Sequence, residues 1–175
     1  MKPSEIFGRI STRQVEGMML HDQMADAFAF LTLPGFEKLH EKQYHSESAE
    51  MRCLHRYYIN HMDMLMADGR PDDPRALPKS WAGYTRQQVT TDTKRKAVRE
   101  MMERWVSWET ETRGIYQECY MHLTDCGEIA AACEVKRLLL DVDEELCRAK
   151  ELHLRLEAVM YDMPTIEQMQ GEIME

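Results

Sequence analysis

The chain has 175 residues, of which 43% are hydrophobic and 30% are charged, and its formal net charge is −9. A chain of this length makes about one domain and can bury a core without disulfides or a metal. The apolar content excludes a disordered chain, the negative charge argues against general nucleic-acid binding, and no apolar run is long enough for a transmembrane helix. The N-terminal sequence MKPSEIFGRI has no apolar signal region, so we expect a cytoplasmic protein.

Helical periodicity runs through the chain, and no segment shows sustained strand alternation. The first long helix is predicted to begin at the motif Ser11-x-x-Gln14, which has the spacing of a capping box. It is predicted to end at Leu33-Pro34-Gly35, and a separate short turn is predicted over residues 4–8. The second helix is predicted over residues 36–66, with its weak point at 44–48, where it could break in two.

The segment 69–90 interrupts the helical pattern and holds three of the six prolines. Such a long connection in a small domain is typical of a functional loop, a disordered segment or a crossover between distant helix ends. The third helix is predicted over residues 91–123. The motif Asp125-x-x-Glu128 has the spacing of a second capping box and is predicted to open the fourth helix, over 126–160. Residues 164–175 are predicted to form an acidic tail.

The fourth helix has the clearest apolar seam of the chain, and its residues recur at spacings of three and four, which predicts packing along one side. The seam consists of Ala132, Val135, Leu139, Val142, Leu146, Ala149, His153, Leu156 and Met160. Together, the elements predict an all-α domain over residues 1–163, in which two helical hairpins are joined by the long crossover.

The stretch MLHDQMADAFAFLTLPGFEKLHEKQYHSESAEMRC resembles the first two helices of ferritin-like proteins, with their aromatic-rich first helix and acidic second helix. The rest of the chain is similar in helix lengths only. This resemblance implies a ferritin-like four-helix bundle. The whole chain is also similar to prophage proteins of Clostridia-type bacteria, around RYYINH, YTRQ and WVSWE. Neither resemblance implies a particular activity.

The ferritin-like resemblance implies a di-iron site with one Glu from each of two helices and a Glu-x-x-His motif from each of the other two. On that pattern, Gln23 stands where the first helix should offer Glu, and Glu50-x-x-Cys53 stands where a Glu-x-x-His motif should lie. The third helix offers Glu109. The fourth helix has no Glu-x-x-His motif, and its nearest inward polar residue is His153. We therefore expect that ferroxidase chemistry has been lost.

Imidazole and carboxylate groups on the inner stripes of facing helices can still bind Fe, Mn or Zn. The candidate ligands are His21, Glu50, His61, Glu109 and His153. The alternative interpretation is that these residues form a buried hydrogen-bond network joining the helices.

Positive charge gathers at the crossover and the start of the third helix, where residues 86–99 hold five basic side chains and one acidic side chain. A helix N-terminus already favours anions, so these residue types are typical of a nucleotide-sized anion site. The candidate ligand-binding residues are Trp81 and Tyr84 for a base, and Arg86, Lys94 and Arg95 for phosphate. Alternatively, the charges pair with nearby acids and the aromatic residues anchor the loop.

The sequence contains no glycine-rich phosphate loop and no recognisable nucleophile–base arrangement, so we favour a protein that is not an enzyme. The favoured hypothesis is a phage-encoded homo-oligomer in the host cytoplasm that needs no cofactor and holds a small anionic ligand of nucleotide type, sequestering a host defence signal. One alternative is a metal-binding ferritin-like protein that uses the inward Glu and His residues. The other is a phage protein-interaction component without a small ligand.

Overall fold

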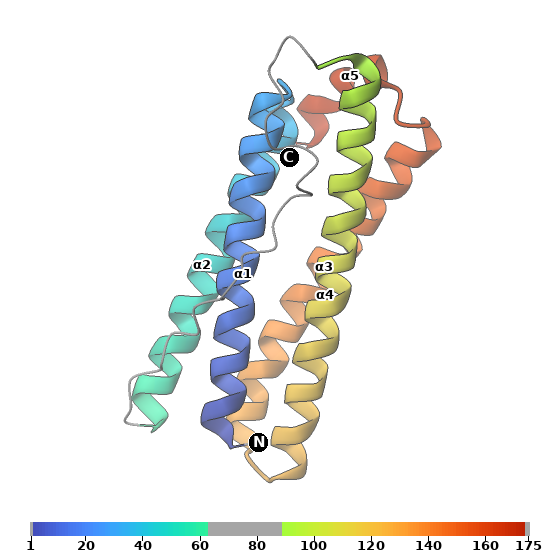
Figure 1. Ribbon diagram of the computed structural model, residues 1–175. Helices are drawn as coiled ribbons and strands as arrows, with labels where there is room; N and C mark the ends of the chain where they lie inside the picture. The colour runs from blue at the N-terminus through green and yellow to red at the C-terminus, as the bar shows by residue number, and fades with distance from the viewer. Residues whose placement is uncertain (1, 63–88, 174–175) are drawn as a thin grey trace.

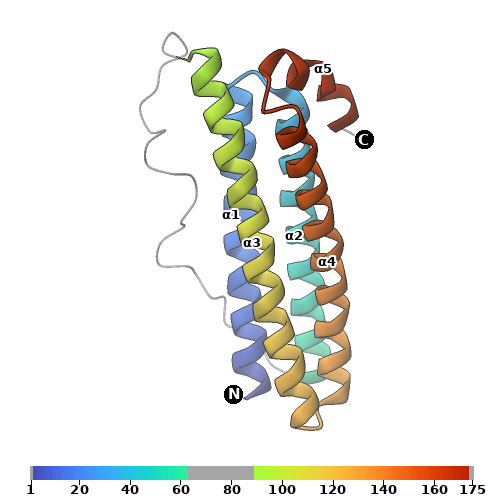
Figure 2. The ribbon, with the colours of Figure 1, turned by 90° about the vertical axis from the view of Figure 1, so that its right-hand side faces the viewer.

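The computed structural model describes residues 2–62 and 89–173, and these residues form helices only. The helices are α1 (Pro3–Phe30), α2 (Pro34–Met62), α3 (Thr91–Asp125), α4 (Ile129–Ala158) and α5 (Met163–Ile173). The four long helices lie side by side along one axis, and α5 lies across one end of the bundle (Figures 1 and 2). The predicted all-α bundle is confirmed.

The long helices form two hairpins, one of α1 and α2 and the other of α3 and α4, and most close backbone contacts lie within each hairpin. Helix α2 ends near the start of the chain, whereas α3 begins at the opposite end of the bundle (Figure 1). The two helix ends that the connecting chain joins therefore lie at opposite ends of the bundle, as expected for a crossover. Most of the predicted crossover 69–90 lies outside the described residues.

Helix α1 begins eight residues earlier than the sequence predicts. Pro3 occupies its first turn, where a missing N–H has no cost, and the Lys2 amide donates a 2.9 Å hydrogen bond to Glu5 Oε2. The predicted cap at Ser11 is wrong, because Ser11 lies inside the helix with its hydroxyl 2.9 Å from His55 Nε2 of α2. The turn predicted over 4–8 is part of α1, and α2 runs through 44–48 without a break.

Helix α3 begins at Thr91, as predicted, and the Thr90 hydroxyl caps it by accepting a 3.1 Å hydrogen bond from the Thr93 amide. The capping box predicted at Asp125 is wrong, because Asp125 is the last residue of α3 and α4 begins only at Ile129. The turn between them contains Gly127 at φ +77°, a left-handed conformation that glycine adopts without steric cost.

The predicted C-terminal tail is helical as far as Ile173. Helix α5 buries Ile166 and Ile173 against the end of the bundle. The Gly35 amide of α2 donates a 2.7 Å hydrogen bond to Gln170 Oε1. A Cβ atom at Gly35 would come within 2.5 Å of the Gln170 carbonyl oxygen, so this glycine permits the close approach of α5 to α2.

The turn from α4 to α5 is conformationally strained. Met160 and Tyr161 both have positive φ values, of 50° and 53°, and residues other than glycine rarely adopt such values. The buried Tyr161 side chain secures the turn, since its hydroxyl lies 2.6 Å from His153 Nδ1 and its ring packs under the Arg99 guanidinium. Asp162 then caps α5 by accepting a hydrogen bond from the Thr165 amide.

The predicted seam of α4 is largely buried, with Leu139 and His153 half-buried at its edge. Met160, the predicted end of the seam, is 78% exposed because α4 has already ended at Ala158.

Candidate metal centre

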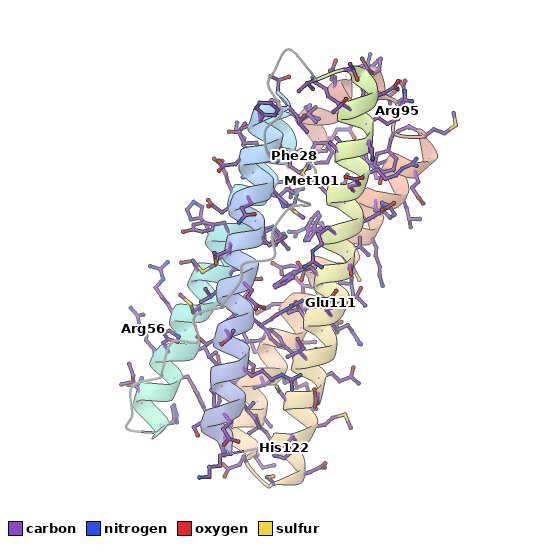
Figure 3. All side chains as sticks on the ribbon, viewed as in Figure 1. Phe28, Arg56, Arg95, Met101, Glu111 and His122 are labelled. Atoms are coloured by element: carbon purple, nitrogen blue, oxygen red, sulfur yellow. The ribbon has the colours of Figure 1, made fainter. Side chains whose placement is uncertain are left out.

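The apolar core of the bundle is divided into two separate clusters. One cluster lies toward α5 and includes Phe28 and Met101, which Figure 3 labels on α1 and α3. The other lies toward the start of the chain and includes Ile10 and Tyr116. Polar residues lie between the two clusters, and we call them the polar layer. They are the buried Arg13, Gln14, Gln43, Glu47, Glu109 and Thr112, together with the half-buried Glu50 and Glu145 at the edge.

Four carboxylates from three helices meet in this layer. Helix α2 supplies Glu47 and Glu50, which lie one helical turn apart, α3 supplies Glu109 and α4 supplies Glu145. Glu109 is fully buried and Glu47 is 5% exposed. Every pair among the four interacts electrostatically, so the four groups lie in one region of the bundle.

Burial and mutual repulsion favour the protonated form of three of these carboxyl groups, Glu47, Glu50 and Glu145. Burial raises the pKa of Glu47 well above its usual value, and the carboxylates of Glu145, Glu50 and Glu109 raise it further. The pKa of Glu145 is raised to about 9, first by burial and then by Glu109 and Glu50. The pKa of Glu50 is raised to about 7, first by burial and then by Asp141. Near neutral pH the layer therefore carries less negative charge than four ordinary glutamates.

The position of Glu47 depends on a glycine in the opposite helix. A Cβ atom at Gly17 of α1 would lie 2.6 Å from Glu47 Oε1, well inside van der Waals contact. A glycine in the middle of a helix is unfavourable by about 0.5–1 kcal/mol relative to alanine, and here it lets a carboxyl group approach the α1 backbone closely.

A buried histidine pair borders the carboxylates. His21 of α1 and His40 of α2 are both fully buried, and their Nδ1 atoms lie 2.9 Å apart. The other ring nitrogen of His21, Nε2, lies 3.7 Å from Glu109 Oε1. The indole N–H of Trp105 donates a 2.9 Å hydrogen bond to the same carboxylate oxygen. A chain of polar groups thus runs from α2 through α1 to α3.

Several buried polar atoms in this region have no hydrogen-bond partner among the described residues. They are Nε2 of His21, Nε2 of His40 and Oε2 of Glu109. Buried polar atoms in native proteins nearly always have a partner. The Glu109 oxygen, and Nε2 of whichever histidine carries its proton on Nδ1, therefore have lone pairs available to a cation. In the part of the chain that the structure describes, no three His, Cys, Asp or Glu side chains already converge closely enough to hold a metal ion.

A groove of about 430 Å³ connects the carboxylates with the surface between α2 and α4. Glu50 and Glu145 line it, so both residues belong to the groove and to the polar layer. Asp141 and Glu144 add negative charge, and Arg137 and Arg148 add positive charge; Ser46, Ala49 and Cys53 complete the lining. An ion entering here would reach the polar layer through Glu50 and Glu145.

The structure brings together three of the five predicted metal ligands. His21, Glu50 and Glu109 belong to the polar layer or its border. His61 lies at the exposed end of α2, where its ring bonds the Tyr57 carbonyl. His153 bonds Tyr161 at the opposite end of the bundle.

The predicted anion site is described only in part, because Trp81, Tyr84 and Arg86 lie outside the described residues. Lys94 Nζ donates a 3.1 Å hydrogen bond to the Thr32 hydroxyl and lies 3.7 Å from Glu167. Arg95, near the start of α3 in Figure 3, pairs with Asp92 at 3.4 Å.

Three residues of the site, Gln14, Glu47 and Glu145, are not among the residues that the sequence predicts. Glu47 and Glu50 have the one-turn spacing that places two ligands on one helix face, and this was the available signal. Glu145 lies between the seam residues of α4, which marks it only weakly. On α1, the buried Gln14 lies in the layer beside Glu50, whereas Gln23 is half-buried.

Comparison with known proteins identifies the fold. No protein-family model and no curated protein matches the chain. Among solved structures, a humanized archaeal ferritin covers 99% of this chain and 96% of its own, with a TM-score of 0.81 and 14% identity. The open-pore ferritin of Archaeoglobus fulgidus gives a TM-score of 0.79 at 14% identity, with 99% and 96% coverage. A PmFTN variant soaked in iron gives 0.77 at 9% identity, with 98% coverage of both chains. The chain therefore has the ferritin-like fold. None of the described helices could span a membrane.

Proposed function

We propose that this protein binds a divalent metal cation in the middle of its bundle, through Glu47, Glu50, Glu109 and Glu145. The observation that carries the proposal is the meeting of four carboxylates from three helices in a buried layer between two apolar clusters. This was an alternative hypothesis from the sequence, and the polar layer now favours it over the anion hypothesis.

The chemistry of the layer fits a cation. Burying several carboxylates together costs free energy unless the groups take up protons or face positive charge. A divalent ion supplies that charge, and carboxylate oxygens suit Mg²⁺, Mn²⁺ and Fe²⁺. Once bound, such an ion would supply charge neutralisation and Lewis acidity at the bundle centre.

Cation binding would have to draw the carboxylates together, because they do not form a closed cage among the described residues. Glutamate side chains can make this adjustment by changing rotamers. The groove between α2 and α4 supports access, since Glu50 and Glu145 face both it and the interior.

Metal titration tests the proposal. Protein stripped with a chelator is titrated with Mn²⁺ and Fe²⁺ (anaerobically), and elemental analysis follows growth in supplemented medium. We expect stoichiometric binding that weakens at least tenfold in Glu47→Gln and Glu145→Gln. Glu151→Gln, an exposed change on α4, should bind normally. Less than about a tenth of an equivalent of every transition metal, together with no Mn²⁺ binding in titration, would contradict the proposal.

A second proposal concerns a nucleotide-type anion at the start of α3. It is supported by Arg95 Nε, which is buried without a hydrogen-bond partner among the described residues, and by the adjacent Lys94. The prophage resemblance supports a role in sequestering a host defence signal. Denatured protein should release a nucleotide, and a nucleotide panel should raise the melting temperature of the wild type but not of Arg95→Gln. Absence of both effects removes this proposal.

We also propose that the protein is a homo-oligomer. The described surface exposes large apolar side chains on α4, such as Leu140 and Leu154, and these are typical of contact surfaces when they cluster. Light scattering coupled to size-exclusion chromatography tests this, and a monomer at micromolar concentration would contradict it.

A further inference from the structure

We infer that His21 supplies a nitrogen ligand to the bound cation through its Nε2 atom, next to Glu109, and that His40 holds the His21 ring in position. This inference rests on the proposed cation site. The ferritin-like pattern takes its nitrogen from Glu-x-x-His motifs, whereas α2 here presents Glu47, Glu50 and Cys53 at successive turns. A nitrogen ligand must then come from another helix, and His21 of α1 is a buried imidazole beside the carboxylates.

The distance between the two candidate ligand atoms suits a shared ion. His21 Nε2 and Glu109 Oε1 lie 3.7 Å apart, which is too far for a hydrogen bond. Two ligand atoms that each lie about 2.1 Å from one ion are separated from each other by a distance close to this one when the ligand–ion–ligand angle is wide. Both groups also have a buried unpartnered atom, Nε2 of His21 and Oε2 of Glu109, among the described residues.

Hydrogen bonds to neighbouring side chains fix the orientation of both groups. The two Nδ1 atoms of His21 and His40 share one hydrogen bond of 2.9 Å, so one of them carries the proton. If Nε2 of His21 binds the ion, the proton must sit on its Nδ1 and His40 Nδ1 accepts the bond. The indole N–H of Trp105 likewise holds Glu109 Oε1. Metal-bound histidines and carboxylates are generally oriented by such outer partners.

Aromatic packing keeps the pair rigid. The His40 ring stacks on Phe28 with an interplanar angle of 5°, and the ring centroids are 5.3 Å apart. The edge of Trp105 meets both imidazoles. Neither ring can turn without displacing these neighbours, so His40 is a positioning residue for His21.

Pulsed EPR of the Mn²⁺-loaded protein tests the inference directly, because the electron spin of Mn²⁺ couples to the ¹⁴N nucleus of a bound imidazole. We expect ¹⁴N modulation in the wild type and in His61→Gln, whose histidine lies at the exposed end of α2. His21→Gln should lose the modulation and weaken Mn²⁺ binding at least tenfold. Circular dichroism of each variant checks that it remains helical.

The positioning role of His40 has its own test. His40→Leu should keep the ¹⁴N modulation but weaken Mn²⁺ binding by about 10–100-fold, the usual effect of losing an outer partner. His40→Gln, which can still accept the Nδ1–H bond, should recover part of the affinity. If His40→Leu binds Mn²⁺ as tightly as the wild type, the positioning role is wrong.

The outcomes separate this inference from the proposed function. A wild-type protein that binds Mn²⁺ without ¹⁴N modulation overturns the inference and leaves the cation site intact, and this measurement needs no variant to fold. Modulation that persists in His21→Gln also overturns it. A wild-type protein that binds no Mn²⁺ overturns both.

Discussion

The stability of the metal-free protein should fall as the pH rises from 6.5 to 8.5. Glu145, with a pKa raised to about 9 by burial and by Glu109 and Glu50, keeps its proton in the folded chain, whereas the unfolded chain has lost it. The folded state then binds more protons than the unfolded state, so the free energy of unfolding decreases with pH. One such group lowers it by about 1.4 kcal/mol per pH unit, or about 2.5 kcal/mol over this window. Glu47, whose pKa is also raised, acts in the same direction.

The window begins at pH 6.5 because His40 acts in the opposite direction below it. Burial, followed by the neighbouring His21, lowers the pKa of His40. The free energy of unfolding therefore decreases as the pH falls below about 6.5, the pKa of histidine in the unfolded chain.

Urea denaturation followed by circular dichroism, in the presence of a chelator, measures the effect. In Glu145→Gln the free energy of unfolding should fall less steeply with pH, by about 1.4 kcal/mol per pH unit. In the exposed variant Glu151→Gln it should fall as steeply as in the wild type. A free energy of unfolding that stays constant or rises between pH 6.5 and 8.5 would refute the assignment of retained protons to the polar layer.

Three further substitutions test the backbone geometry, each by urea denaturation. Gly35→Ala should lower the free energy of unfolding by about 1–3 kcal/mol, because its Cβ meets the Gln170 carbonyl oxygen at 2.5 Å; an unchanged value would show that α5 does not dock closely. Gly114→Ala, whose Cβ meets nothing within 4 Å, should raise it by about 0.5–1 kcal/mol, and a loss would contradict this open environment. Met160→Gly, at φ +50° on an exposed position, should raise it by about 0.5 kcal/mol, since the strain relieved exceeds the added chain entropy; destabilisation would indicate that the turn is not left-handed.

The sequence was sufficient for the four long helices, because their apolar periodicity is local, but not for α5. The sequence was less reliable for the ends of the helices, because a polar residue there can either cap the helix or contact a neighbouring helix. Ser11 has the spacing of a cap, yet it lies inside α1 and contacts His55 of α2. Only the position of the neighbouring helix distinguishes these roles. The capping box predicted at Asp125 failed for a similar reason, because α3 continues through this residue.

The candidate site was only partly predictable. Glu47 and Glu145 resemble the many glutamates on solvated helix faces, and their burial depends on how the two hairpins face each other. A resemblance to a family indicates which helices correspond but not which residues of each helix face the interior, and only the packing of the helices identifies Gln14 as buried. Nothing in the sequence indicates the role of Gly17, because this role depends on the Glu47 side chain, which reaches the α1 backbone from α2.

The concentration of backbone contacts within each hairpin has a kinetic consequence. Chains dominated by short-range contacts fold in microseconds to milliseconds, because little loop entropy is lost before contacts form. Each hairpin can therefore assemble early from its own stretch of chain, and the slow step becomes the encounter of the two halves. That encounter buries the glutamates, so ions present during synthesis could be captured at the moment when the halves close.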